Sequence, residues 1–246
     1  MPAPVPVTLD RTSAVPLYHQ LAVQLEAAIA DGTLRPGDAF ENELALASRL
    51  RLSRPTVRRA IAELTAQGLL VRRRGVGTRV ATPVTQRADA VNSLYDDLLA
   101  TGRTPRTQVL RLETGVRHDR AAAALGLDQS ARLVYVERLR YADDDPLARL
   151  VNWLPPAYAD ITVDDLQRGG LYALLRARGA RPTTGRQTIR ARTPSGDERR
   201  LLRLTRGDAV LMITRTTVDP DGVPVEFGEH CYRGDQYAFE ATVTIP

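Results

Sequence analysis

The chain has 246 residues, 43% of them hydrophobic and 26% charged, which is the balance of an ordinary globular protein with one or two domains. Its single cysteine, Cys231, excludes an internal disulfide, and its three histidines lie too far apart in the sequence to predict a metal site or imply a cofactor. No apolar run approaches the roughly 18 residues of a membrane span. Residues 1–12 lack the basic and apolar segments of a signal peptide, so we expect a cytoplasmic protein that does not enter a membrane.

All 34 basic residues are arginine, and the net charge of +5 is unevenly distributed. Between residues 44 and 80, nine arginines occur with one acid, Glu63. The phosphate backbone of a nucleic acid attracts such a local excess of positive charge. A solvated basic face explains the charge alone equally well, so the surrounding motif has to decide between the two.

The first third of the chain predicts helices whose apolar residues recur at helical spacing, over residues 16–31, 43–50 and 54–67. Asn42 and Ser53 are suitable N-caps for the second and third of these helices. Two short strands follow within residues 69–80, around a glycine turn flanked by arginines. Three helices and a basic hairpin predict a winged helix-turn-helix domain over residues 1–81, whose third helix would enter the major groove of DNA.

Residues 82–90 are polar, contain Pro83 and are predicted to form a linker to a second domain over residues 91–246. In that domain we expect helices at 93–100, 119–125, 170–178 and 196–202. Strands are expected at 107–116, 133–141, 148–154, 184–192, 209–218, 225–232 and 237–245. Hairpins with interspersed helices predict an antiparallel sheet, so the fold class is α+β.

The motifs of the first domain resemble the DNA-binding domain of the GntR family of transcription regulators. They are PLYHQL at 16–21, DGTLRPGD at 31–38, SRPTVRRAIAEL at 53–64, QGLL at 67–70 and RGVGTRV at 74–80. The second domain resembles the UTRA effector domain of the HutC subgroup, which has a chorismate lyase-like fold. Its motifs are YDDLLATGRTP at 95–105, YVERLRYADDDPLA at 135–148, NWLP at 152–155, GLYALL at 170–175 and YRGDQYAF at 232–239.

This resemblance implies a homodimer that binds a palindromic operator in double-stranded DNA. It also implies a small-molecule effector, here an organic acid or phosphorylated metabolite, that changes operator binding from the second domain. Two alternatives remain: a constitutive plasmid-type repressor whose second domain only dimerises, and an enzyme related to chorismate lyase.

The candidate DNA-binding residues lie on the second and third predicted helices and on the hairpin. Arginine and threonine at the start of a recognition helix can read a base edge or hold a phosphate, and glycines permit a tight wing tip that approaches the minor groove. The candidates are Asn42, Arg54, Thr56, Arg58, Arg59, Arg72, Arg74, Gly75, Gly77 and Arg79.

Arg138 and Arg140 share one face of a predicted strand and therefore need anions, from a ligand or from internal pairing with Asp143 to Asp145 or Glu226. The resemblance places these two arginines in the effector pocket. It adds Glu226 and Tyr232 as a hydroxyl-binding pair. It further adds Thr104, Arg106, Thr107, Asn152 and Tyr172 as pocket positions.

The chain departs from its relatives at three places. Glu41 adds a negative charge near the expected DNA surface, and Val76 replaces a basic residue that many relatives carry between the wing glycines. Leu150 lies in the pocket where relatives often have glutamate. This last departure predicts a more apolar pocket wall and a less hydroxylated effector.

Overall fold

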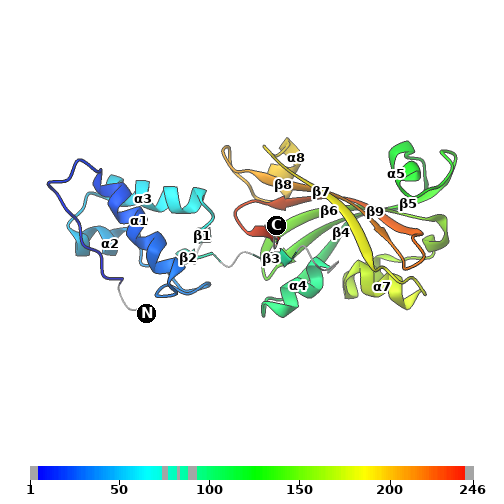
Figure 1. Ribbon diagram of the computed structural model, residues 1–246, viewed down its shortest axis with the longest axis horizontal. Coiled ribbons are helices and arrows are strands. Elements are labelled where there is room, and N and C mark those ends of the chain that lie inside the picture. Colours follow the sequence, from blue (N-terminus) through cyan, green and yellow to red (C-terminus); the bar gives the residue numbers. More distant parts are fainter. Residues whose placement is uncertain (1–4, 74–76, 82–83, 88–92, 242–246) are drawn as a thin grey trace, which may run out of the picture. The chain divides into compact units, whose positions relative to one another are not determined.

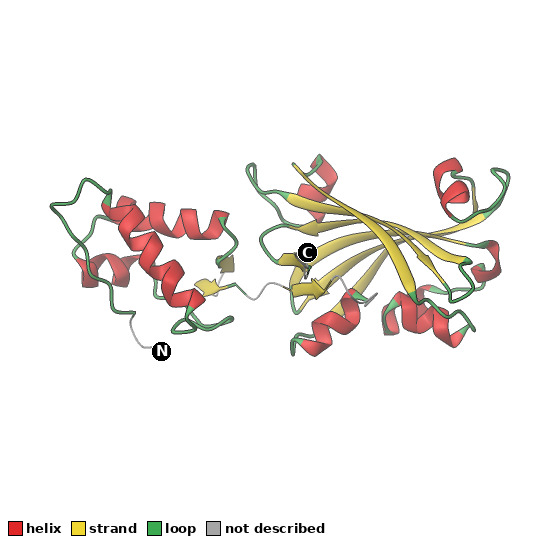
Figure 2. Ribbon diagram, viewed as in Figure 1, coloured by secondary structure: helices red, strands yellow, loops and turns green. Residues whose placement is uncertain are grey.

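The computed structural model describes residues 5–73, 77–81, 84–87 and 93–241. The chain divides into two compact units, Met1–Pro83 and Val84–Pro246, and each unit has its own hydrophobic core. Figure 1 colours both units along the sequence, and Figure 2 distinguishes their helices from their strands. No described helix is long and apolar enough to cross a membrane.

The first unit contains three helices and a hairpin, as the sequence predicted. The elements are α1 (Leu17–Ala30), α2 (Glu43–Leu50), α3 (Arg54–Ala66), β1 (Leu70–Arg73) and β2 (Gly77–Val80). The Asn42 side chain accepts a hydrogen bond from the amide of Ala45, and Ser53 does the same for the amide of Thr56, which caps α2 and α3. The core of the unit includes Leu21, Leu25, Leu46, Val57, Ile61 and Leu64.

The second unit is built on a six-stranded antiparallel sheet with the strand order β4-β5-β6-β9-β8-β7. The strands are β4 (Pro105–Val116), β5 (Leu133–Ala142), β6 (Asp145–Leu154), β7 (Thr184–Arg192), β8 (Val210–Val218) and β9 (Pro224–Arg233). The helices are α4 (Leu94–Ala100), α5 (Asp119–Ala124), α6 (Val163–Arg168), α7 (Leu171–Ala177) and α8 (Gly196–Leu201). The helices α4 and α7 cover one face of the sheet, and α5 and α8 lie on the other (Figure 1). The predicted α+β class is therefore correct.

The predicted linker differs from the structure. Residues Val84–Arg87 form a strand, β3, that pairs in parallel with β10 (Tyr237–Glu240) near the end of the chain. Sequence reasoning missed this strand because β3 is only four residues long and its partner lies about 150 positions away in the chain. It also missed α6 and a short 3-10 helix at Pro156–Tyr158. The predicted final strand at 237–245 extends in part beyond the described residues.

Candidate functional site

The start of α3 presents an exposed polar surface. The side chain of Arg58 is 67% exposed, and its Nε lies 3.5 Å from the carboxylate of Glu43 on α2. Arg54 is also exposed, and the hydroxyl of Thr56 shares a 2.7 Å hydrogen bond with Ser53. A phosphate or guanine edge can therefore reach Arg54 directly, whereas it has to compete with Glu43 for Arg58.

Two of the other candidate arginines make contacts inside the first unit. The guanidinium of Arg59 lies 3.9 Å from the ring centroid of Tyr18, where a cation–π contact holds it against α1. Arg79 donates to the carbonyl of Gly37 at 2.9 Å and so ties the hairpin to the turn before α2. Both contacts give these arginines structural roles that the sequence did not predict.

The negative charge of Glu41 should repel DNA less than its position in the sequence suggests. Glu41 accepts hydrogen bonds from Arg49, the shortest at 2.8 Å, so its charge is paired inside the unit.

At the wing, Gly77 has a φ of 100°, a conformation that favours glycine. Arg74, Gly75 and Val76 lie outside the described residues, as does the side chain of Arg72, and their assignments stay predictions.

The face of the six-stranded sheet that carries α4 and α7 contains a small pocket. Because side chains alternate along a strand, Arg138 and Arg140 of β5 lie on this face, as the sequence predicted. The empty space between its lining residues amounts to about 380 Å³, a figure that includes open solvent, so the enclosed part of the pocket is much smaller. Its lining residues are Ser93, Leu94, Tyr95, Arg138, Arg140, Leu150, Asn152, Leu171, Tyr172, Arg215, His230 and Tyr232.

Arg138 and Arg140 are 2% and 1% exposed, respectively. Arg138 donates to Asn152 Oδ1 at 2.6 Å, and Arg140 donates to the hydroxyl of Thr107 and lies over the ring of Tyr95. Burial lowers the pKa of Arg138 to about 10, and burial together with the charge of Arg138 lowers the pKa of Arg140 to about 9. Both guanidinium groups remain charged at neutral pH. The Nε of each is buried and has no hydrogen-bond partner in the structure.

Glu226 is fully buried and lies behind the pocket wall. Its Oε1 accepts hydrogen bonds from Tyr172 at 3.0 Å and Thr217 at 2.8 Å, and its Oε2 accepts one from Asn152 at 2.6 Å. The expected role of Glu226 in binding ligand hydroxyls is therefore not what the structure shows, because protein donors already use both of its oxygens. Its expected partner Tyr232 does line the pocket and stacks on Tyr237 with ring centroids 4.0 Å apart.

Besides Glu226, three predicted pocket residues do not line the pocket. Thr107 is buried and accepts the hydrogen bond of Arg140. Arg106 is exposed and its guanidinium lies 3.5 Å from the ring centroid of Tyr141, because alternation along β4 points it away from its neighbour Thr107. Thr104 precedes the strand, is exposed, and donates its amide to Asp143. The carboxylate of Asp143 pairs with Arg103 at 3.1 Å rather than with the pocket arginines.

Arg215 and His230 belong to the pocket but were missed by sequence reasoning. Arg215 is 4% exposed and donates to Gln187 at 2.8 Å, and His230 is 6% exposed. A signal was present, since His230 alternates with Glu226 and Tyr232 on β9 and so shares their face. Gly228, on the same face, leaves room for the imidazole: a Cβ there would lie 2.5 Å from His230 Nε2.

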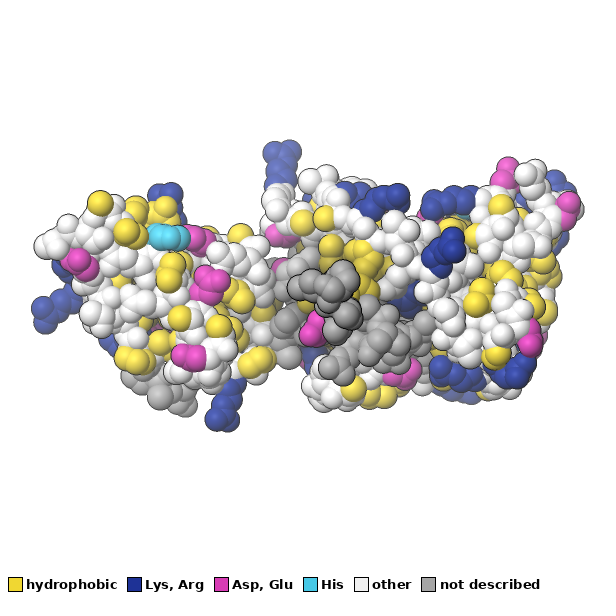
Figure 3. Space-filling model, in the orientation of Figure 1, with side chains coloured by type: hydrophobic (Ala, Val, Ile, Leu, Met, Phe, Trp, Pro, Cys, Tyr) yellow, Lys and Arg dark blue, Asp and Glu magenta, His cyan; other side chains and the backbone are white. Residues whose placement is uncertain are grey.

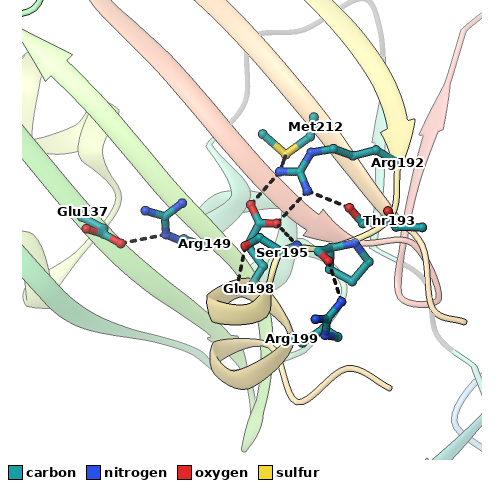
Figure 4. A network of polar contacts seen from close by, with 9 residues as sticks. Glu137, Arg149, Arg192, Thr193, Ser195, Glu198, Arg199 and Met212 are labelled. Carbon is teal, nitrogen blue, oxygen red and sulfur yellow. Dashed lines mark hydrogen bonds and ion pairs between the residues drawn. The ribbon is translucent and has the colours of Figure 1, made fainter. Parts of the chain in front are cut away.

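On the opposite face of the sheet, Arg149 and Arg192 pair with carboxylates (Figure 4). Arg192 donates to both oxygens of Glu198 at 2.7 Å, and Arg149 donates to Glu137 at the same distance. The hydrogen bonds from Arg192 lower the pKa of Glu198 to about 2. Arg149 and Arg192 therefore have carboxylate partners on one face of the sheet, whereas Arg138 and Arg140 line the pocket on the other. Among the described residues, no group of three or more His, Cys, Asp or Glu side chains could hold a metal ion.

Comparison with known proteins matches both parts of this description. Residues 17–80 match the gntR family of bacterial regulatory proteins, and residues 100–238 match the UTRA domain family. The chain belongs to the GntR family. It combines the two domains that the sequence motifs predicted, and so it is a ligand-responsive, DNA-binding transcription regulator.

Three relatives show how far this likeness extends. The HTH-type transcriptional regulator Rv0792c of Mycobacterium tuberculosis is 36% identical over 95% of this chain and 88% of its own length. The histidine utilization repressor of Pseudomonas aeruginosa is 34% identical over 82% of this chain and 81% of its own length. The crystal structure of PhnF from Mycobacterium smegmatis superposes with a TM-score of 0.62 and 27% identity, covering 92% of this chain and 99% of PhnF. These comparisons give no support to the constitutive-repressor and enzyme alternatives.

If Arg58 reads a base, Arg58→Ala should weaken binding to a specific duplex by about 1–3 kcal/mol and reduce the preference over a scrambled duplex. Arg59→Ala is the matched control and should change that preference less, because Arg59 rests on Tyr18. Fluorescence anisotropy on a duplex selected by this protein from a random library measures both. Equal affinity of the wild type for the selected and scrambled duplexes would contradict the assignment.

Glu226→Gln should destabilise the second unit by about 3–5 kcal/mol, since it removes the buried negative charge that lies among buried arginines. Glu229→Gln, on the opposite face of the same strand, removes a carboxylate that pairs with the exposed Arg120 and should cost about 0–1 kcal/mol. Denaturant unfolding of both variants tests the difference. A similar small loss in both would show that Glu226 does not hold the pocket together.

Proposed function

We propose that this regulator is a repressor that acts in the cytoplasm as a homodimer on a palindromic operator. Its effector is a small acidic metabolite, an organic acid or a phosphorylated compound, whose anionic group binds between Arg138 and Arg140. The effector changes operator affinity when it occupies this pocket.

Two buried guanidinium groups on one wall of the pocket carry the proposal. Arg138 and Arg140 are 2% and 1% exposed, and the buried carboxylate of Glu226 acts on Arg138. Asp96 of α4 also acts on Arg140, but it is exposed and solvent screens its charge. A ligand anion would supply negative charge and accept hydrogen bonds from the unpartnered guanidinium nitrogens.

The pocket wall favours an acid with few hydroxyl groups. Leu150 contributes an apolar side chain where relatives often have glutamate, and Glu226 has both oxygens engaged by the protein. Ligand hydroxyl groups would therefore find few charged acceptors. This supports a compact organic acid over a sugar phosphate.

A chain of contacts leads from the pocket toward the first unit. Tyr232 lines the pocket and stacks on Tyr237 of β10, and β10 pairs with β3. Val84, the first residue of β3, is buried in the same core as both tyrosines. Since β3 begins four residues after β2 ends, a ligand that moves Tyr232 acts on the segment that joins the two units.

The small number of bases that one winged helix can contact supports the homodimer. One winged helix contacts too few bases to define a unique site, and a two-fold dimer doubles the contacts on a palindrome. We expect residues 91–246 to carry most of the dimer contact.

A thermal-shift screen of carboxylic acids and sugar phosphates at constant ionic strength tests the effector site on the full chain. An acid that binds should raise the melting temperature, because it stabilises only the folded state. Arg138→Ala and Arg140→Ala should each reduce that shift, and Arg106→Ala, whose side chain lies outside the pocket, is the control. If both pocket variants respond as the wild type does, the arginines are structural and the proposed site is wrong. If no acid raises the melting temperature of the wild type, the result favours the alternative of a constitutive repressor.

Analytical ultracentrifugation tests the assembly. The full chain and the second unit, residues 84–246, should both sediment as dimers at about ten micromolar, well above the dissociation constant of a stable interface. A monomeric fragment beside a dimeric full chain would place the interface in the first unit or the linker.

A further inference from the structure

A set of hydrogen bonds fixes the orientation of Asn152 at the pocket wall. Arg138 can only donate, so the atom it contacts at 2.6 Å is the amide oxygen of Asn152. The amide nitrogen then donates to Glu226 Oε2 at 2.6 Å. The same nitrogen lies 3.2 Å from His230 Nε2. Because an NH₂ group donates, Nε2 of His230 has to be the acceptor and carries no hydrogen.

The remaining ring nitrogen of His230 is therefore a donor. Burial and the charges of Arg215 and Arg138 hold the pKa of His230 well below its ordinary value, so the imidazole is neutral and its one hydrogen is on Nδ1. Nδ1 is buried and has no hydrogen-bond partner in the structure. A buried donor without an acceptor is costly, and a ligand acceptor removes that cost.

Three buried donors at the pocket have no hydrogen-bond partner in the structure. They are His230 Nδ1, Arg138 Nε and Arg140 Nε. Protein donors already use both oxygens of Glu226. Leu150, which lies opposite His230 in the pairing of β6 with β9, is apolar.

We propose that His230 is a specificity-determining residue that selects an effector with acceptor groups at both ends, such as a dicarboxylic or keto acid. This inference rests on the proposed function, in which the first acidic group binds Arg138 and Arg140. The second acceptor takes the hydrogen of His230 Nδ1. A ligand ammonium group near His230 is repelled by the positive charges of Arg138 and Arg215. A ligand hydroxyl group in the same place can accept from His230, but its own hydrogen finds no charged acceptor.

A matched series of ligands tests the selection on the full chain. The probes are α,ω-dicarboxylates of three to six carbons, each compared with the ω-hydroxy and ω-amino acid of the same length, by isothermal titration calorimetry at constant ionic strength. At the best length the wild type should bind the dicarboxylate at least about tenfold more tightly than the other two. His230→Phe keeps a ring but lacks the donor, and it should reduce this preference to about threefold or less. His19→Phe, in the first unit, should retain the wild-type preference.

The outcomes separate this inference from the proposed function. If the wild type binds the dicarboxylate and His230→Phe keeps the full preference, His230 does not determine specificity and only this inference fails. If the wild type binds the ω-amino acid as tightly as the dicarboxylate, this inference likewise fails and the proposed function stands. If no acid binds the wild type, the acidic effector itself is wrong, and the inference fails with it.

Nitrogen-15 NMR of the three histidines in the wild type tests the donor without any change to the pocket. The spectrum of His230, assigned by the signals lost in His230→Phe or, if that variant does not fold, by heteronuclear correlation, should show a protonated Nδ1 and a bare Nε2. The Nδ1 signal should shift when a binding dicarboxylate is added. A protonated Nε2, or an Nδ1 signal that stays unchanged under saturating ligand, would overturn the proposal.

Discussion

Three buried arginines and one buried glutamate on a single sheet face impose the constraint on which the second unit depends. Removing a guanidinium from water costs several kcal/mol, and the cost is repaid only where hydrogen bonds and opposite charge are close. Here Thr107, Asn152 and Gln187 each accept a hydrogen bond from one of the three arginines. These hydrogen bonds hold the guanidinium groups in fixed positions on one face of the sheet.

The antiparallel sheet makes this arrangement possible. Strand pairing places Arg138 opposite Leu150, and Leu150 opposite His230, so residues far apart in the sequence meet on one face. On the other face the same alternation brings Arg149 beside Glu137, where the charges are paired. On the face drawn in Figure 3, basic and acidic side chains both occur at the surface, in contrast to the unequal charges of the pocket.

Much of this could be predicted from the sequence, because local rules decide it. Helical periodicity and the caps Asn42 and Ser53 gave the first unit, and strand alternation put Arg138 and Arg140 on one face. The internal role of Glu226, the outward direction of Arg106 and the pairing of β3 with β10 depend on contacts between distant segments, which periodicity does not reveal.

The central claim is that the arginine pocket and the DNA-binding surface are energetically coupled. Linkage is reciprocal, so an effector that changes operator affinity by a given factor must itself bind the operator complex with an affinity changed by the same factor. The most direct measurement is therefore calorimetric titration of a binding acid into the free protein and into its operator complex. Coupling between the pocket and the DNA-binding surface predicts dissociation constants for the acid that differ by about fivefold or more. Equal constants would show that the pocket binds acids without controlling DNA.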